Sequence, residues 1–493
     1  MWIGRRKRLS LGSLALALSV STAAVPAYAD TLREALVSTY NTNPTLQGAR
    51  ATQRATDEDV PIQRASGLPS VDVEGTYIEF LKASPNIFAP TERNLTIGPN
   101  LIVPIYSGGA VKNGMKAAKE RVAAGQAGLR GTESSIFSQA VAAYMDVLRT
   151  EALAGLAANQ VDVLQVNLEA TSDRFEIGDL TRTDVAQSQS RLAIAESDLR
   201  NALANLINAR ETYIEIIGTA PVDLQAPPPL PGLPETVGEA VATAMESNPD
   251  LIAAKERADA AGFDYKAAGA GRLPTLGAFA NYDYSDSFGT LQGGLAEFQN
   301  ETTANAGLRL TIPIFQGGLT AARQRQAGAR ETAALEQVIA TERNVINQVR
   351  SAYASWEASN AVIESSKTAV SAAELSLEGV RAENSIGNRS ILDVLNAEQE
   401  LLSARAQLVT ARRNAYVAGF TLLAAMGRAE ARDLNLDTGG PLYDPQVNYD
   451  RVRKKLWDWD RDPEAAPNST RTVDIPAPDA TIGPQLEDSP PNM

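Results

Sequence analysis

The sequence contains neither cysteine nor histidine. Without cysteine there can be no disulfide and no lipid-modified cysteine anchor. The joint absence also removes the usual zinc and copper ligands, the histidine general base and the thiol nucleophile. An enzyme would have to rely on carboxylates, serine or lysine, and no Gly-x-Ser-x-Gly or Ser-x-x-Lys motif stands in a suitable turn. We therefore expect a protein that is not an enzyme and that uses no metal or other cofactor.

Positive charge is scarce, because 45 Lys and Arg residues stand against 59 Asp and Glu residues, for a net charge of −14. Four of the basic residues stand together at Arg5–Arg8, before an apolar run from Leu9 to Val20 and the small-residue site Ala27-Tyr-Ala29. This pattern predicts a secretory signal over residues 1–29, with cleavage before Asp30, since the run is too short to cross a membrane. The exported chain then carries about −18, and we do not expect nucleic acid as a partner.

Proline is absent from two long stretches, residues 105–220 and 314–440. Both are rich in Ala, Leu, Gln, Glu and Arg, and their apolar residues recur about every 3.5 residues, which is typical of helices in coiled-coil packing. The predicted long helices cover residues 109–176 and 319–384. Each is followed by a return helix, the first of about 38 residues after the turn at Ile177-Gly178 and ending at Gly218, the second over 390–427. Each long helix would measure about 100 Å, which is more than one globular core accommodates.

Each long helix is preceded by apolar residues that alternate with a period of two, as in a strand. The change of period occurs at Val103-Pro-Ile-Tyr-Ser-Gly-Gly109, which returns as Ile312-Pro-Ile-Phe-Gln-Gly-Gly318. Proline cannot donate to a strand ladder and a glycine pair tolerates a sharp bend, so we expect a strand-to-helix junction at each copy. The junction residues are Pro104, Gly108, Gly109, Pro313, Gly317 and Gly318.

The junctions belong to an internal duplication. An offset of 205 residues aligns Asn43-Pro44 with Asn248-Pro249, and an offset of 209 aligns Ile177-Gly178 with Ile386-Gly387. The chain is therefore expected to be two copies of one unit. The expected segments are a signal over 1–29, a first repeat over 30–218, a proline-rich linker over 219–235, a second repeat over 236–428, a segment over 429–461 and a disordered tail over 462–493.

The first repeat shows the expected order of elements. Short helices over residues 32–40 and 44–66, the second kinked near Pro61, precede two strands, which begin at Ser70 and end at Pro104. The helix before the strands and the return helix together nearly match the long helix in length, so both are expected to stack end to end beside it. Polar loops are predicted between the strands, over residues 83–93 here and 285–302 in the second repeat.

Four strands per chain are too few to enter a membrane alone. A lipid-embedded sheet must close on itself to leave no unpaired edge, and spanning barrels begin at eight strands. If these strands enter a membrane, several chains must share one barrel.

The segment from Tyr443 to Asp460 is amphipathic and is expected to pack on the outside of the helical body. Trp457 and Trp459 leave open a role at a membrane interface.

The junctions, the paired Asn-Pro breaks and the sequence Ile386-Gly-Asn-Arg-Ser-Ile-Leu-Asp-Val-Leu395 together resemble the TolC-like outer membrane factor family over roughly residues 31–430. The resemblance implies a mixed α and β, internally duplicated fold. In it, four transmembrane β-strands per chain contribute to a trimeric β-barrel in the outer membrane, and a long α-helical coiled-coil tunnel extends into the periplasm. The implied partners are two further copies in a homotrimer, a periplasmic adaptor, an inner-membrane ABC or proton-driven transporter, and outer membrane lipid.

In that family the periplasmic end of the tunnel is closed near the helix tips. By motif match, the gate and constriction positions here are Thr183, Asp184, Arg389, Asp393 and Asn396. Relatives carry a second Asp where this chain has Asn396, and a Tyr where it has Asn384, so the acidic ring would hold three carboxylates and the latch would lack its aromatic part. A pair between Arg389 and Asp184 is expected to remain. The alternative is that Asp184 and Asp393 only cap helices.

The resemblance also implies that the adaptor docks on the tips, at Gly178, Asp179, Leu180, Gly387 and Asn388. Two functions therefore stay open. The first is an export duct in the outer membrane, which serves efflux or type I secretion. The second is a structural coiled-coil protein of the envelope that its strands merely anchor.

Overall fold

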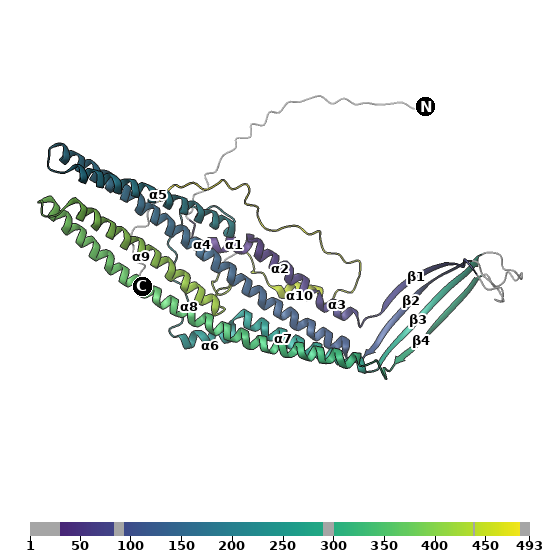
Figure 1. Cartoon of the computed structure of the whole chain (residues 1–493). Coiled ribbons are helices and arrows are strands. Elements are labelled where there is room, and N and C mark those ends of the chain that lie inside the picture. The colour runs from purple at the N-terminus through teal and green to yellow at the C-terminus, as the bar shows by residue number, and fades with distance from the viewer. Residues whose placement is uncertain (1–29, 83–92, 289–299, 437–438, 484–493) are drawn as a thin grey trace, which may run out of the picture.

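The computed structural model describes residues 30–82, 93–288, 300–436 and 439–483. These form a long helical body that carries a four-stranded sheet at one end and two separate helical hairpins at the other (Figure 1). The mixed α and β fold expected from the sequence is therefore confirmed. Within the described part of the chain, no helix combines the length and the apolar character that crossing a membrane requires.

The sheet joins the two repeats. It consists of β1 (Ser70–Glu79), β2 (Arg93–Ser107), β3 (Thr275–Phe288) and β4 (Asn300–Thr311), in this order and antiparallel throughout. The register between the repeats pairs Ile97 of β2 with Tyr284 of β3. Among the described strands, β1 and β4 each have one edge without a partner.

Two expected strand boundaries differ from the structure. The strand β2 does not end at Pro104 but continues to Ser107, because a register shift between Pro104 and Tyr106 accommodates a residue that has no N–H to donate. The loop expected over 285–302 is shorter, since β3 and β4 extend into it and pair Ser285 with Glu301. These strand ends consist of polar residues, so the apolar alternation that predicts a strand is missing there. The strands continue nevertheless, because a ladder needs only backbone groups. The loop expected over 83–93 lies almost entirely outside the described residues.

Glycine pairs form the turns from strand to helix. Gly108 and Gly109 have φ of 63° and 88°, and Gly317 and Gly318 have φ of 60° and 81°. Residues with a side chain rarely adopt this left-handed conformation, which explains the glycines at both copies. Each pair leads directly into a helix of 67 residues, α4 (Ala110–Glu176) and α8 (Leu319–Ser385).

Shorter helices lie end to end beside each long helix, as predicted (Figure 1). The first repeat contains α1 (Leu32–Thr42), α2 (Pro44–Asp57), α3 (Asp59–Ala65) and α5 (Arg182–Ile217), and the second contains α6 (Val237–Ser247), α7 (Pro249–Gly269), the 3-10 turn η1 (Ala270–Arg272) and α9 (Ile391–Ala425). The break between α2 and α3 falls at Glu58, just before Pro61, whose ring cannot follow an unbroken helix.

The Asn-Pro breaks join the stacked helices in both repeats. Asn43 accepts hydrogen bonds from the first backbone N–H groups of α2, and its amide donates to the carbonyl of Ile216 at 2.9 Å. Asn248 does the same for α7 and donates to the carbonyl of Ala425 at 2.9 Å. One side chain thus satisfies unpaired groups at two helix ends.

The main core lies halfway along the body, where α1, α4, α5 and α9 meet around Phe137, Tyr144 and Tyr213. The proline-rich linker over 219–235 packs against this core. The hydroxyl of Tyr144 lies 2.7 Å from the carbonyl oxygen of Gln225 and 2.9 Å from that of Asp30, so its one proton is shared between them, and Leu224 is buried.

The C-terminal segment packs on the outside of the body. The helix α10 (Pro445–Val452) buries Tyr449 and Val452, the former in a cluster with Val60 and Val122, as its amphipathic pattern predicts. The sequence predicts a disordered tail over residues 462–493. Residues 462–483 differ from this expectation because they follow the body, and residues 484–493 lie outside the described part of the chain. Arg210 donates to the carbonyl of Thr481 at 2.9 Å, and the N–H of Gly483 donates to Glu151 at 2.7 Å. These bonds involve charged side chains of the body, which the composition of the tail does not reveal.

Candidate functional site

The two helix tips have the same backbone design. In the first, the N–H groups of Gly178 and Asp179 donate to the carbonyls of Phe175 and Arg174 at 3.0 and 2.9 Å, and Gly178 has φ of 84°. In the second, Gly387 and Asn388 donate to Asn384 and Glu383 at 3.0 and 2.9 Å, and Gly387 has φ of 80°. This is the Schellman arrangement that ends a helix at glycine. Leu180 follows at the first tip, partly buried.

Each return helix begins with a reciprocal cap. The carboxylate of Asp184 accepts hydrogen bonds from the N–H and hydroxyl of Thr181 at 2.9 and 2.7 Å, and Asp393 accepts the same bonds from Ser390 at 3.0 and 2.8 Å. These bonds favour the ionised carboxylate and lower the pKa of both aspartates. Both expected gate acids therefore cap helices within the chain.

Arg389 forms an ion pair within its own tip. Its Nε lies 2.7 Å from a carboxylate oxygen of Glu383 in the last turn of α8, and this hydrogen bond, together with the charge of Glu383, raises the pKa of Arg389. Within the described chain, no bond joins Arg389 to Asp184, so the expected pair does not form inside one copy. The amide of Asn384 donates to the carbonyl of Arg389 at 2.8 Å. The residue that replaces the expected Tyr thus also closes the turn.

The two hairpins, α4 with α5 and α8 with α9, are connected below the tips. Asn396 accepts a hydrogen bond of 3.0 Å from Arg191 of α5. Thr183 is exposed on the first turn of α5. Among the expected gate residues, only Asn396 forms a side-chain hydrogen bond to the other hairpin within the described chain. An uncharged amide is therefore found where the family resemblance leads one to expect a second carboxylate.

A second connection between the hairpins is not predicted by the sequence pattern. Glu398 of α9 is only 4% exposed, and both of its carboxylate oxygens accept from the amide of Asn167 on α4, at 3.1 and 3.0 Å. Arg381 of α8 donates to the same carboxylate at 3.0 Å. Glu398 therefore joins three helices from both hairpins. One signal could have revealed it, since Glu398 follows the buried Val394 and Leu395 at spacings of four and three, on the apolar face of α9.

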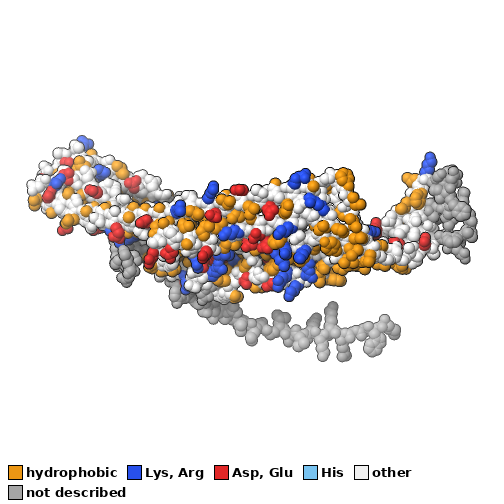
Figure 2. All heavy atoms as spheres, turned by 90° about the horizontal axis from the view of Figure 1, so that it is seen from below, with side chains coloured by type: hydrophobic (Ala, Val, Ile, Leu, Met, Phe, Trp, Pro, Cys, Tyr) orange, Lys and Arg blue, Asp and Glu red, His pale blue; other side chains and the backbone are white. Residues whose placement is uncertain are grey.

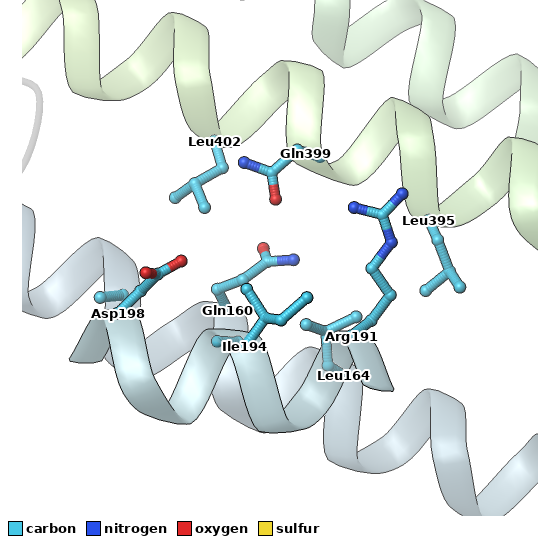
Figure 3. A pocket seen from close by; sticks show the side chains of 10 residues that line it. Gln160, Leu164, Arg191, Ile194, Asp198, Leu395, Gln399 and Leu402 are labelled. Carbon is cyan, nitrogen blue, oxygen red and sulfur yellow. The ribbon is translucent and has the colours of Figure 1, made fainter. Parts of the chain in front are cut away.

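A small cavity of about 40 Å³ lies between the hairpins next to these connections. Figure 3 shows Gln160, Leu164, Arg191, Ile194 and Asp198 facing Leu395, Gln399 and Leu402 of α9 across it. A space of this size holds water molecules but no larger solute.

Comparison with known proteins identifies the fold. The family model described as outer membrane efflux protein matches residues 35–219 and 240–428, which correspond to the two repeats. The outer membrane efflux protein BepC of Brucella suis is 33% identical over 430 residues, which cover 87% of this chain and 92% of that protein. The outer membrane protein TolC of Escherichia coli is 29% identical over 61% of this chain and 63% of its own length.

Solved structures show the same architecture. The CmeC outer membrane channel of Campylobacter jejuni superposes with a TM-score of 0.72 at 17% identity, over 87% of this chain and 90% of that one. At this identity the likeness shows the fold alone.

Proposed function

The chain belongs to the outer membrane efflux protein family, and on this premise we propose that three copies assemble into a duct for export across the outer membrane. The chain is an outer membrane channel protein whose helical part lies in the periplasm. The observation that carries the proposed assembly is the sheet, which has two unpartnered edges among its described strands and exposes most of its side chains on both faces.

A shared barrel resolves both features. The free edge of β1 would pair with that of β4 in the next copy, so that no backbone group stays unpaired in lipid. Three copies supply twelve strands, and the trimer itself rests on the family resemblance. Val71, Val73 and Tyr77 are each more than half exposed in the single chain and would then face lipid or the barrel interior.

The hairpins would line the periplasmic tunnel, and their tips would form its entrance. Asp393 of three copies would create a negatively charged constriction, with Thr183, Asp184, Arg389 and Asn396 around it. Opening requires the hairpins to separate, which would break the bonds from Arg191 to Asn396 and from Asn167 to Glu398. Arg389, which bonds to Glu383 within its own copy, could exchange this partner for Asp184 of a neighbour.

The adaptor and the transporter are inferred from the same family membership. The glycine turns Gly178-Asp179-Leu180 and Gly387-Asn388 would receive a periplasmic adaptor, which connects the duct to an inner-membrane ABC or proton-driven transporter. Export needs no catalytic step in this chain, because the transporter supplies the energy.

Conductance in planar bilayers tests the proposal. A duct gives discrete channels that prefer cations, because the constriction carries carboxylates. A structural envelope protein that is only anchored by its strands gives no channels, even though it inserts as an oligomer, and this result would overturn the proposed function.

A further inference from the structure

We propose that the loop formed by residues 453–461, here named the tryptophan loop, binds the phospholipid surface of the outer membrane on its periplasmic side. Leu456, Trp457 and Trp459 would enter the headgroup region, and Lys454 and Arg461 would meet lipid phosphates. The inference rests on the proposed function in one respect, namely that the sheet lies in the outer membrane.

The tryptophan loop lies at the level where the sheet begins. The backbone carbonyl of Arg453 accepts a hydrogen bond of 2.9 Å from Arg64, in the last turn of α3. Three residues later, a Cβ atom placed on Gly67 would come within 2.9 Å of Val111, in the first turn of α4. The strand β1 starts at Ser70. Figure 1 shows the chain turning beside α3 after α10 and then running back along the body.

The loop exposes large apolar side chains. Leu456 is 63% exposed, and Trp457 and Trp459 are each 74% exposed. Side chains of this size are mostly buried in soluble proteins. The preceding helix α10 buries Tyr449 and Val452 against the body, so one side of the segment is packed while the other lacks a partner within the described chain.

Ion pairs hold the loop in this shape. Asp462 bonds to Arg451 at 2.7 and 2.9 Å and to Lys455 at 3.2 Å, and these bonds strongly lower the pKa of Asp462. Lys455 also lies 3.1 Å from Asp460. The network closes the base of the loop, so the structure presents the two indoles from a braced turn.

The charges suit a membrane with anionic lipids. Residues 451–462 contain five basic and three acidic side chains, in a chain whose net charge is −14. Arg451, Arg453 and Lys455 are paired, whereas Lys454 and Arg461 have no ion-pair partner within the described residues. Tryptophan beside lysine and arginine is the combination that concentrates at membrane–water interfaces.

Other apolar side chains mark the same level. Around the two junctions, Ile105, Tyr106, Ile314 and Phe315 are exposed by 55, 51, 95 and 87%. Figure 2 shows apolar side chains gathered where the helical body meets the sheet. A lipid surface would cover this end of the body and the tryptophan loop together, and this continuity favours lipid over a protein partner.

Quenching of tryptophan fluorescence tests the inference. The full chain is reconstituted into vesicles of phosphatidylethanolamine and phosphatidylglycerol whose acyl chains carry bromine near the headgroup. We expect the brominated lipid to quench the wild-type tryptophan emission. In the double variant W457F/W459F, we expect most of this quenching to disappear. Trp356 is the internal control, because it lies 37 residues along α8 from Leu319, or about 55 Å from the junction.

A charge variant separates lipid from other partners. K454E/R461E should reduce the quenching in vesicles that contain phosphatidylglycerol, whereas the distant control K367E should leave it unchanged. Equal quenching in wild type and W457F/W459F overturns the inference. So does protection of both indoles from aqueous acrylamide without quenching by brominated lipid, which would show that a second copy covers the loop.

Conductance measured on the same vesicles keeps the two proposals apart. Channels without lipid quenching refute the lipid contact and leave the proposed function intact. If the inserted protein forms no channels, the proposed function fails and the inference loses its premise.

Discussion

The long helices α4 and α8 have equal length and occupy the same place in the duplicated unit, but their surroundings differ. The helix α4 lies between other helices and buries side chains from Ala117 to Thr171. Within the described chain, α8 buries only six, namely Val345, Val349, Ala352, Ser366, Ala373 and Leu377. It leaves Leu335, Ile339 and Leu375 exposed by 53, 45 and 71%. Two copies of one unit thus supply one helix that other helices cover and one that keeps large apolar side chains exposed in the single chain.

The tips show a second difference between the repeats. Both end in a Schellman turn followed by a capping box, but only the second carries an additional brace, from Arg389 to Glu383 and from Asn384 to the carbonyl of Arg389. The first tip relies on backbone and cap bonds within the described chain. Within the described chain, the second tip therefore has two side-chain bonds that the first tip lacks.

The largest effect is expected on assembly. Replacing Leu335 and Leu375 by Asp should dissociate the oligomer, because the carboxylates would be buried at the contact between copies without partners. Light scattering in detergent measures the mass. The control Val447→Asp changes a residue of α10 that is 68% exposed and should leave the oligomer intact. An oligomer that tolerates the α8 changes, or a wild type that is monomeric, would refute the assignment of α8 as an interface.

At the tips, Gly178→Trp and Gly387→Trp should abolish export while the oligomer still assembles, because the bulk occupies open space where the adaptor would dock. Any side chain at these positive φ angles costs about 1–2 kcal/mol. Gly178→Ala and Gly387→Ala carry the same backbone strain without the bulk, and they should retain most export. Drug efflux or protein secretion in cells is the readout. Normal export by both Trp variants would contradict the docking site.

Between the hairpins, Glu398→Ala should open the entrance. The variant leaves Asn167 and Arg381 without their shared partner, which destabilises the contact between the hairpins by about 1–3 kcal/mol. We therefore expect a higher single-channel conductance and a lower temperature of thermal unfolding. Glu400→Ala is the matched control, because Glu400 is exposed on the same helix. Identical conductance for the two variants would mean that Glu398 does not hold the hairpins together.

The paired aspartates separate capping from gating. Asp184→Ala and Asp393→Ala remove equivalent caps, so hydrogen exchange should accelerate at the start of α5 or α9 by a similar factor. Only Asp393→Ala should also weaken cation preference and block by multivalent cations, and Asn396→Asp should strengthen that block. If ion selectivity is unchanged in Asp393→Ala, both aspartates are only caps.

Arg389→Ser should raise conductance and antibiotic leakage, because the ion pair with Glu383 is lost.

The smallest effect concerns pH. The pKa values of Asp184 and Asp393 are lowered in the folded chain, so their caps stabilise the helices fully above the ordinary aspartate pKa of about 3.9. This stabilisation is lost as the pH falls through the lowered values. Amide protection at both tips should therefore decline below about pH 4 and not between pH 5 and 8. In Asp184→Ala and Asp393→Ala this decline should disappear at the changed tip.

The sequence alone determined the repeating parts of the molecule. A period near 3.5, the absence of proline and the glycine pairs determine the long helices and both turns, because these signals act within a few residues of the backbone. The duplication placed the two tips and their caps at matching positions, and the capping of Asp184 and Asp393 is itself a local effect.

Only the tertiary structure decided which side chains meet across the hairpins. Arg191 bonds to Asn396 and Glu398 to Asn167, over separations of 205 and 231 residues, and no local pattern specifies such partners. The same holds for the strand that continues past Pro104 and for the tail that lies against Arg210. In each case a distant element supplies the hydrogen bonds, so composition and period, which describe only neighbouring residues, do not contain the answer.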